Sequence, residues 1–197
     1  MKKIYEIIKP FLLIILGALM LLCYLNLLQG QEGILALGII ALVAAVFYLA
    51  YGIVGIILGD KLPAALKKGL DIAAICVFPV FMFVYYLISV ITILQNDGVV
   101  GPSGWIISIL GMVAAIGLVA AYIVAAFVKK KLLARLAQLF ALAFVLSLLL
   151  NMLFDAAGNP NVLGNINVVE LLIYVSYGAL LFAAVPALNG KSEEKAE

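Results

Sequence analysis

The pattern of hydrophobic and polar positions divides the chain into six long apolar runs separated by short polar segments. A helix needs about 20 mostly apolar residues to cross the hydrocarbon core of a bilayer, where backbone N–H and C=O groups find no partner outside the segment. The runs are apolar on all sides, whereas barrel strands alternate, so the pattern favours helices. The runs without a charged residue cover 10–31, 33–59, 72–96, 98–128, 136–154 and 171–190.

The pattern therefore predicts an all-α membrane protein, a bundle of six transmembrane helices built from three helical hairpins. A single transmembrane domain is expected over 1–190, followed by a disordered, charged cytoplasmic tail at 191–197. The predicted helices cover approximately 11–28, 34–59, 72–95, 105–128, 136–154 and 168–188.

Prolines and glycines refine these boundaries. Pro10 is well placed in the first turn of the first helix. Pro79 lies inside the third helix, where it removes a backbone hydrogen bond to Ile75 and predicts a kink. The connection at 60–71 is either a short interfacial helix, ended by Gly69, or a plain polar loop.

Two segments share the pattern Tyr-x-x-Tyr-Gly. They are Tyr48-Leu-Ala-Tyr51-Gly52 in the second helix and Tyr174-Val-Ser-Tyr177-Gly178 in the sixth. Because they fall at different depths of the predicted helices, we attribute the likeness to chance and expect the repeat to be one of topology only.

Composition and charge support a membrane location and an orientation. Hydrophobic residues make up 68% of the chain and charged residues 11%, against about 45–50% and about 25% in soluble domains. With six crossings and the N-terminus inside, all 12 lysine and arginine residues fall on one side. The positive-inside rule then predicts a multi-pass protein of the cell membrane with both termini in the cytoplasm.

Small residues four positions apart predict close helix contacts in the second and fourth helices. Such residues let two helix backbones approach, and van der Waals contact is a main source of helix association in lipid. We expect these two helices near the centre of the bundle, and the leucine-rich first and fifth helices to face lipid. The predicted packing residues are Gly55, Gly59, Gly111, Ala115, Gly117 and Ala121.

The sequence offers little for catalysis. It contains no histidine, and no nucleophile is placed near a base, so we do not expect an enzyme. Cys23 and Cys76 fall inside predicted helices and are interpreted as apolar filler. We expect no metal site, no cofactor and no nucleic-acid partner.

Three polar residues near the outer helix ends are the candidate ligand-binding set: Asn26, Asn151 and Glu170. The amides can instead form interhelical hydrogen bonds. The carboxylate can instead stabilise the N-terminus of the sixth helix.

Two classes of function remain open. We favour a small-solute transport component, a membrane-embedded substrate-binding or permease subunit with a ligand cavity in the outer half of the bundle. The alternative is a non-catalytic assembly or regulatory protein that binds other membrane proteins through its small-residue helix faces. The expected partners are the lipid bilayer, a small-molecule ligand, and other membrane-protein subunits or a second copy of the chain.

Overall fold

The computed structural model describes residues 2–25, 32–95, 102–128, 130–157 and 168–184. These residues form α-helices and a short 3-10 helix, and none of them lies in a strand. Five of the helices are long and apolar enough to cross a membrane, and the sixth is shorter, with 17 residues. The prediction of an all-α six-helix membrane bundle is therefore confirmed. The elements are α1 (Lys2–Tyr24), α2 (Glu32–Leu58), η2 (Gly59–Lys61), α3 (Ala64–Gln95), α4 (Pro102–Val128), α5 (Lys131–Ala157) and α6 (Val168–Ala184).

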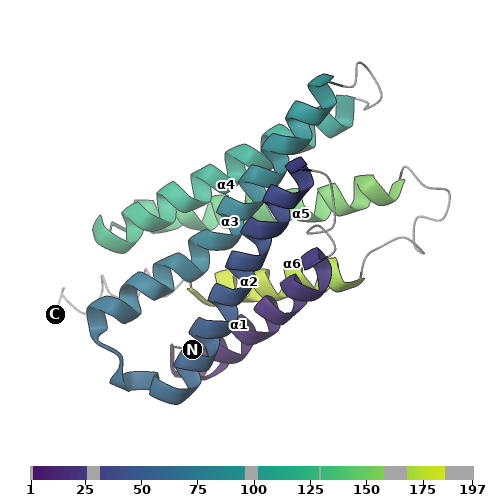
Figure 1. Cartoon of the computed structure of the whole chain (residues 1–197). Coiled ribbons are helices and arrows are strands. Elements are labelled where there is room, and N and C mark those ends of the chain that lie inside the picture. Colours follow the sequence, from purple (N-terminus) through teal and green to yellow (C-terminus); the bar gives the residue numbers. More distant parts are fainter. Residues whose placement is uncertain (1, 26–31, 96–101, 129, 158–167, 185–197) are drawn as a thin grey trace.

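The contacts between the six helices follow one another around a closed ring, and Figure 1 shows this bundle from the side. Each helix contacts the next one along the chain, and α6 closes the ring by packing on α1. The contacts are most extensive between α1 and α2 and between α4 and α5, and least extensive around the ring between α5 and α6. Across the ring, α3 and α6 also touch. The two helices of the third predicted hairpin are thus neighbours, but α6 contacts α1 more extensively than α5.

The described basic residues gather at one end of this ring, which we call the basic end. Side-chain contacts join the start of α1 to the start of α3, the end of α2 to the start of α3, and the start of α3 to the end of α4. The start of α5 follows directly after α4. The residues concerned are Lys2, Lys3, Lys9, Lys61, Lys67, Lys68, Lys130, Lys131 and Arg135.

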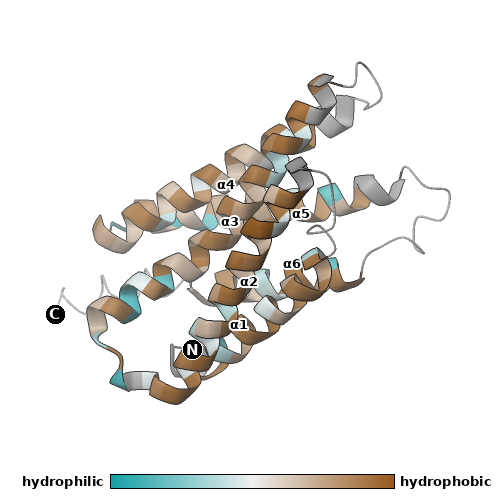
Figure 2. Cartoon of the chain, viewed as in Figure 1, coloured by the Kyte–Doolittle hydropathy of each residue, from teal (hydrophilic) through white to brown (hydrophobic). Residues whose placement is uncertain are grey.

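The outward faces of the helices are apolar. Figure 2 shows hydrophobic residues over most of each helix, with hydrophilic residues at the start of α3 and in the connection before it. Phe182 is 81% exposed and Ile57 is 70% exposed. Such a surface requires lipid as its solvent, which agrees with a membrane protein.

An aromatic cluster fills the centre, where α3, α5 and α6 meet. Phe78, Phe144, Tyr174 and Tyr177 are almost completely buried. The ring centroids of Phe78 and Tyr177 lie 4.7 Å apart, and those of Phe144 and Tyr177 lie 5.9 Å apart in an edge-to-face arrangement. Such pairs add to the free energy of burial and fix the relative rotation of the three helices.

Five helices begin earlier than the sequence predicted, and the shift is largest in α1 and α3. α1 starts at Lys2, so Pro10 lies inside it rather than in its first turn. α3 starts at Ala64 and continues through Gly69, so the segment 64–71 belongs to α3 and is neither a separate helix nor a loop. Polar residues at the helix starts did not stop the helices, because several of them pair with one another, as described below.

The predicted packing positions have different outcomes. A Cβ on Gly111 would overlap the ring of Tyr86, and one on Gly117 would overlap the ring of Phe140. A Cβ on Gly55 would lie 3.2 Å from the Pro10 ring. Ala115 is buried, and Ala121 packs against the core while partly exposed.

The structure shows no close helix contact at Gly59 among the residues it describes. No described atom lies within 4 Å of the position of its Cβ, and its φ of +46° instead lets the chain leave α2 in a left-handed conformation.

The helices at the centre of the bundle differ from the predicted second and fourth helices. In the apolar spans, 44% of residues are buried in α3 and α4, against 33% in α1, α2 and α5, so the second helix is no more central than the first.

Candidate functional site at the basic end

Close packing of α1 on α2 positions the candidate site. A Cβ on Gly52 would lie 2.8 Å from the carbonyl oxygen of Pro10, so only glycine permits this approach. Gly55, one turn further on, faces the Pro10 ring. The contact sets Lys9 of α1 beside Tyr51 of α2, since each is the chain neighbour of a contacting residue.

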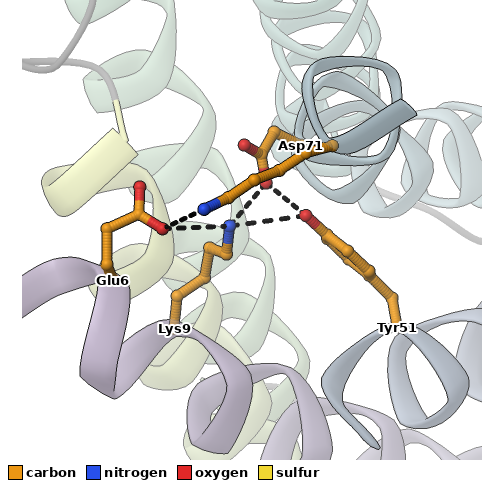
Figure 3. A network of polar contacts seen from close by, with 5 residues as sticks. Glu6, Lys9, Tyr51 and Asp71 are labelled. Atoms are coloured by element: carbon orange, nitrogen blue, oxygen red, sulfur yellow. Dashed lines mark hydrogen bonds and ion pairs between the residues drawn. The ribbon is translucent and has the colours of Figure 1, made fainter. Parts of the chain in front are cut away.

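A network of charged and polar side chains joins the three helices here (Figure 3). The Lys9 ammonium donates a hydrogen bond of 2.6 Å to Asp71 Oδ1, and the Tyr51 hydroxyl donates to the same oxygen. Lys9 Nζ also lies 3.4 Å from the Tyr51 hydroxyl oxygen and 4.0 Å from Glu6 Oε2. Lys67 Nζ forms a second ion pair with Glu6, at 3.0 Å. Figure 3 shows Glu6 and Lys9 reaching in from α1, Tyr51 from α2 and Asp71 from α3.

The network is neutral and its central lysine is buried. Lys9 is 4% exposed, and the side chain of Asp71 is 32% exposed. The charges of the two ammonium groups cancel those of the two carboxylates. Removing an ammonium group from water costs several kcal/mol, and only a well-placed partner offsets that cost. The strong coupling of Lys9 to Asp71 therefore ties α1 to α3 in one arrangement.

A pocket of about 180 Å³ lies beside the network. Its polar wall includes Glu6, Lys9 and Tyr51, and its apolar wall includes Leu13 and Leu62. A pocket with both signs of charge on one side and alkyl groups on the other can admit water or a small polar molecule to the ion pair.

Two tyrosines hold α3 together just above the network, at Pro79. Because proline has no N–H, the carbonyl of Ile75 loses its helical donor, and the hydroxyl of Tyr177 on α6 donates to it instead. The Tyr48 hydroxyl on α2 accepts from the N–H of Phe78 and donates to the carbonyl of Ala74, each at 3.0 Å. At this point side chains from two other helices therefore support the backbone of α3.

The ligand-binding residues predicted from the sequence lie at the opposite end. Asn151 on α5 and Glu170 on α6 are both half-buried, and Glu170 accepts a hydrogen bond from Tyr174 in its own helix. Asn26 falls outside the described residues, so a joint site of the three residues remains a prediction.

The sequence did not reveal the network, because Lys9 and Asp71 were interpreted only as charges at helix ends that set the orientation of the chain in the membrane. A signal was present. Ile7 and Ile8 directly precede Lys9 and a long apolar run follows it, while Leu70 and Ile72 flank Asp71. Both charges therefore stand where the apolar part of a helix begins, and a charged residue that enters the bundle there needs a partner.

Among the described residues, no cluster of three or more cysteine, aspartate and glutamate side chains is placed to hold a metal ion. Comparison with protein-family models, with curated proteins and with solved structures gives no match.

Proposed function

We propose that the chain is a membrane-embedded component of a small-solute transport system, in which the pair of Lys9 and Asp71 is a latch that closes the basic end. The observation that carries the proposal is the burial of Lys9 against Asp71 inside two apolar helices. Burying a charged side chain at such a position costs free energy, and charged residues found there are typical of solute and ion pathways.

The support of α3 at Pro79 suggests how the latch opens. Asp71 lies on residues 64–78, the part of α3 that precedes the proline, which we call the latch segment. Hydroxyl groups of Tyr48 and Tyr177 hold the backbone at the end of this segment. Bonds to side chains of other helices can be exchanged for water without unwinding α3, so Pro79 is a suitable hinge.

The orientation follows from the charges. The basic end lies on the cytoplasmic side of the cell membrane according to the positive-inside rule. A solute would enter from the opposite end, where Asn151 and Glu170 lie, together with Asn26 of the predicted set. The structure would then represent the state closed toward the cytoplasm.

The alternative, an assembly or regulatory protein, has less support. It requires small-residue helix faces that are free to bind partners. The faces of Gly111 and Gly117 instead receive the rings of Tyr86 and Phe140 from neighbouring helices, and Gly55 receives Pro10. We therefore do not favour this second class, and we propose no catalytic activity.

Native mass spectrometry of the full chain, extracted from its membrane in mild detergent, tests the proposal. The proposal is supported if the protein retains a small molecule, and if Asp71→Asn changes this retention while the Lys61→Gln control does not. Lys61 is exposed at the same end, and no described ion pair includes it, so this control removes one charge at the same end without touching the latch. A stoichiometric protein partner with no small molecule in any sample contradicts the proposal.

A further inference from the structure

The weakest seam of the ring, between α5 and α6, contains a groove of about 450 Å³. Its walls include Gln138, Leu142 and Val145 on α5 and Gly178, Leu181 and Phe182 on α6. We call it the α5–α6 groove. Phe182 and Leu142 are 81% and 61% exposed, so the groove opens outward, toward lipid.

Gly178 marks the floor of the groove and has room around it. The nearest described atom to a Cβ at this position is a methyl group of Val145, at 3.9 Å, which is ordinary van der Waals distance. The glycines at Gly17, Gly52, Gly111 and Gly117 are different, because a Cβ there would lie within 2.8 Å of a neighbouring helix. The space at Gly178 is thus a local property of this seam.

The α5 wall changes in character along its length. Lys131, Arg135, Gln138, Leu142 and Val145 follow one another at spacings of four and three residues, which places them on one face of the helix. From the basic end inward this face presents two cations, one amide and then alkyl groups. The same order of charge, polar linker and hydrocarbon is found along a phospholipid.

We propose that the α5–α6 groove binds one acyl chain of an anionic phospholipid, whose phosphate lies against Lys131 and Arg135. Neither cation forms an ion pair with any acidic residue that the structure describes, and both are exposed. The polar part of Gln138 faces the glycerol region, and the acyl chain follows Leu142 and Val145 to Gly178. This site is independent of the latch and of the proposed transport function.

The dimensions favour a lipid chain over a partner helix. From Gln138 to Val145 the groove follows seven residues of α5, about 10 Å along the helix axis. A helix with its side chains is itself about 10–12 Å wide, so it could contact only a short part of its length here. An acyl chain is narrow and flexible enough to fill the groove and to bridge the two helices where their own contact is sparse.

The test uses the purified full chain in detergent with added phosphatidylglycerol or phosphatidylcholine of identical acyl chains. Native mass spectrometry and thermal unfolding measure lipid retention and stabilisation. We expect one retained phosphatidylglycerol and little phosphatidylcholine. Arg135→Gln should weaken retention about fivefold, which corresponds to about 1 kcal/mol for one basic residue near a membrane surface. The matched control Lys61→Gln should retain lipid as the wild type does.

A second pair of variants tests the groove itself. Gly178→Leu fills the groove and should abolish both retention and stabilisation. Gly69→Leu places the same side chain on an open helix surface and should leave both unchanged. The proposal is overturned if Gly178→Leu retains the lipid, or if both lipids bind equally and Arg135→Gln has no effect. It is also overturned if Gly178→Leu removes a second copy or another protein instead of a lipid.

Discussion

At the scale of single residues, Lys9 is the most informative position. Its ammonium group is held by Asp71 and Tyr51, with Glu6 at 4.0 Å. A buried ion pair contributes little net stability, since the loss of hydration offsets most of the attraction between the charges. Its main effect is to raise the free energy of arrangements in which α1 and α3 are apart. The two helices cannot separate at this end unless both charges regain water or another partner.

We predict that Asp71→Asn lowers the free energy of unfolding by about 3 kcal/mol, because Lys9 stays buried and keeps only the more distant Glu6, at 4.0 Å, as an opposite charge. The estimate is at the low end for buried pairs, since Asp71 is one-third exposed. Adding Lys9→Met to Asp71→Asn should recover most of the loss, because the buried ammonium group is then gone and Glu6 keeps its ion pair with Lys67. Unfolding in detergent measures these changes, with Lys61→Gln expected within about 0.5 kcal/mol of the wild type. Equal losses in the single and double variants would show that the two side chains do not interact.

The sequence could predict the number of helices and the apolar exterior, because each depends on composition along the chain. It could not predict that Lys9 meets Asp71, because that contact depends on the relative height and rotation of α1 and α3. Gly59 illustrates the same limit. Its spacing from Gly55 suggested a helix contact, whereas its φ of +46° shows a left-handed exit from α2, which spacing alone does not distinguish.

At the scale of elements, α3 is the helix that the others support. The sequence predicted that Pro79 would remove the hydrogen bond to the Ile75 carbonyl. In the structure the Tyr177 hydroxyl donates a hydrogen bond to this carbonyl. The two Tyr-x-x-Tyr-Gly segments, whose likeness we attributed to chance, make the same two kinds of contact in reversed order. In each segment one tyrosine bonds to the α3 backbone, Tyr48 or Tyr177, and the other donates to a carboxylate, Tyr51 to Asp71 and Tyr174 to Glu170.

We predict that Tyr177→Phe lowers the free energy of unfolding by about 1–3 kcal/mol, because it leaves the buried Ile75 carbonyl without a donor. In a Pro79→Ala background the same change should cost less, since the new N–H at position 79 can bond to Ile75 itself. The two substitutions should therefore couple by about 1 kcal/mol or more in a double-mutant cycle. Strict additivity would mean that Tyr177 does not replace the donor that proline removes.

At the scale of the whole molecule, latch and hinge together make a prediction about access to the interior. Cys76 lies on the latch segment between Asp71 and Pro79, and Cys23 lies near the far end of α1. Asp71→Asn should make Cys76 react about tenfold faster with a small hydrophilic thiol reagent, corresponding to about 1.4 kcal/mol in the opening equilibrium. The reactivity of Cys23 should not change, because the other end stays closed.

Cys23 also serves as the internal control for this experiment. Global unfolding would expose both thiols together, whereas opening of the latch exposes only Cys76. Mass spectrometry of labelled peptides separates the two sites within one sample. If Asp71→Asn accelerates both thiols equally, the variant is simply less stable, and the pair of Lys9 and Asp71 does not control access.

The charge distribution predicts which way the molecule lies in the membrane. Every described lysine and the one arginine lie at the basic end, and moving such residues across a bilayer is unfavourable. We predict that a cysteine introduced by Lys61→Cys, in a background without Cys23 and Cys76, is protected in intact cells from a membrane-impermeant thiol reagent. A cysteine introduced by Val168→Cys, at the exposed start of α6, should react. After permeabilisation both should react, which controls for burial. Reaction of both in intact cells would place the two ends of the bundle in one compartment, and neither the latch nor a pathway from Glu170 toward Lys9 could then operate across a membrane.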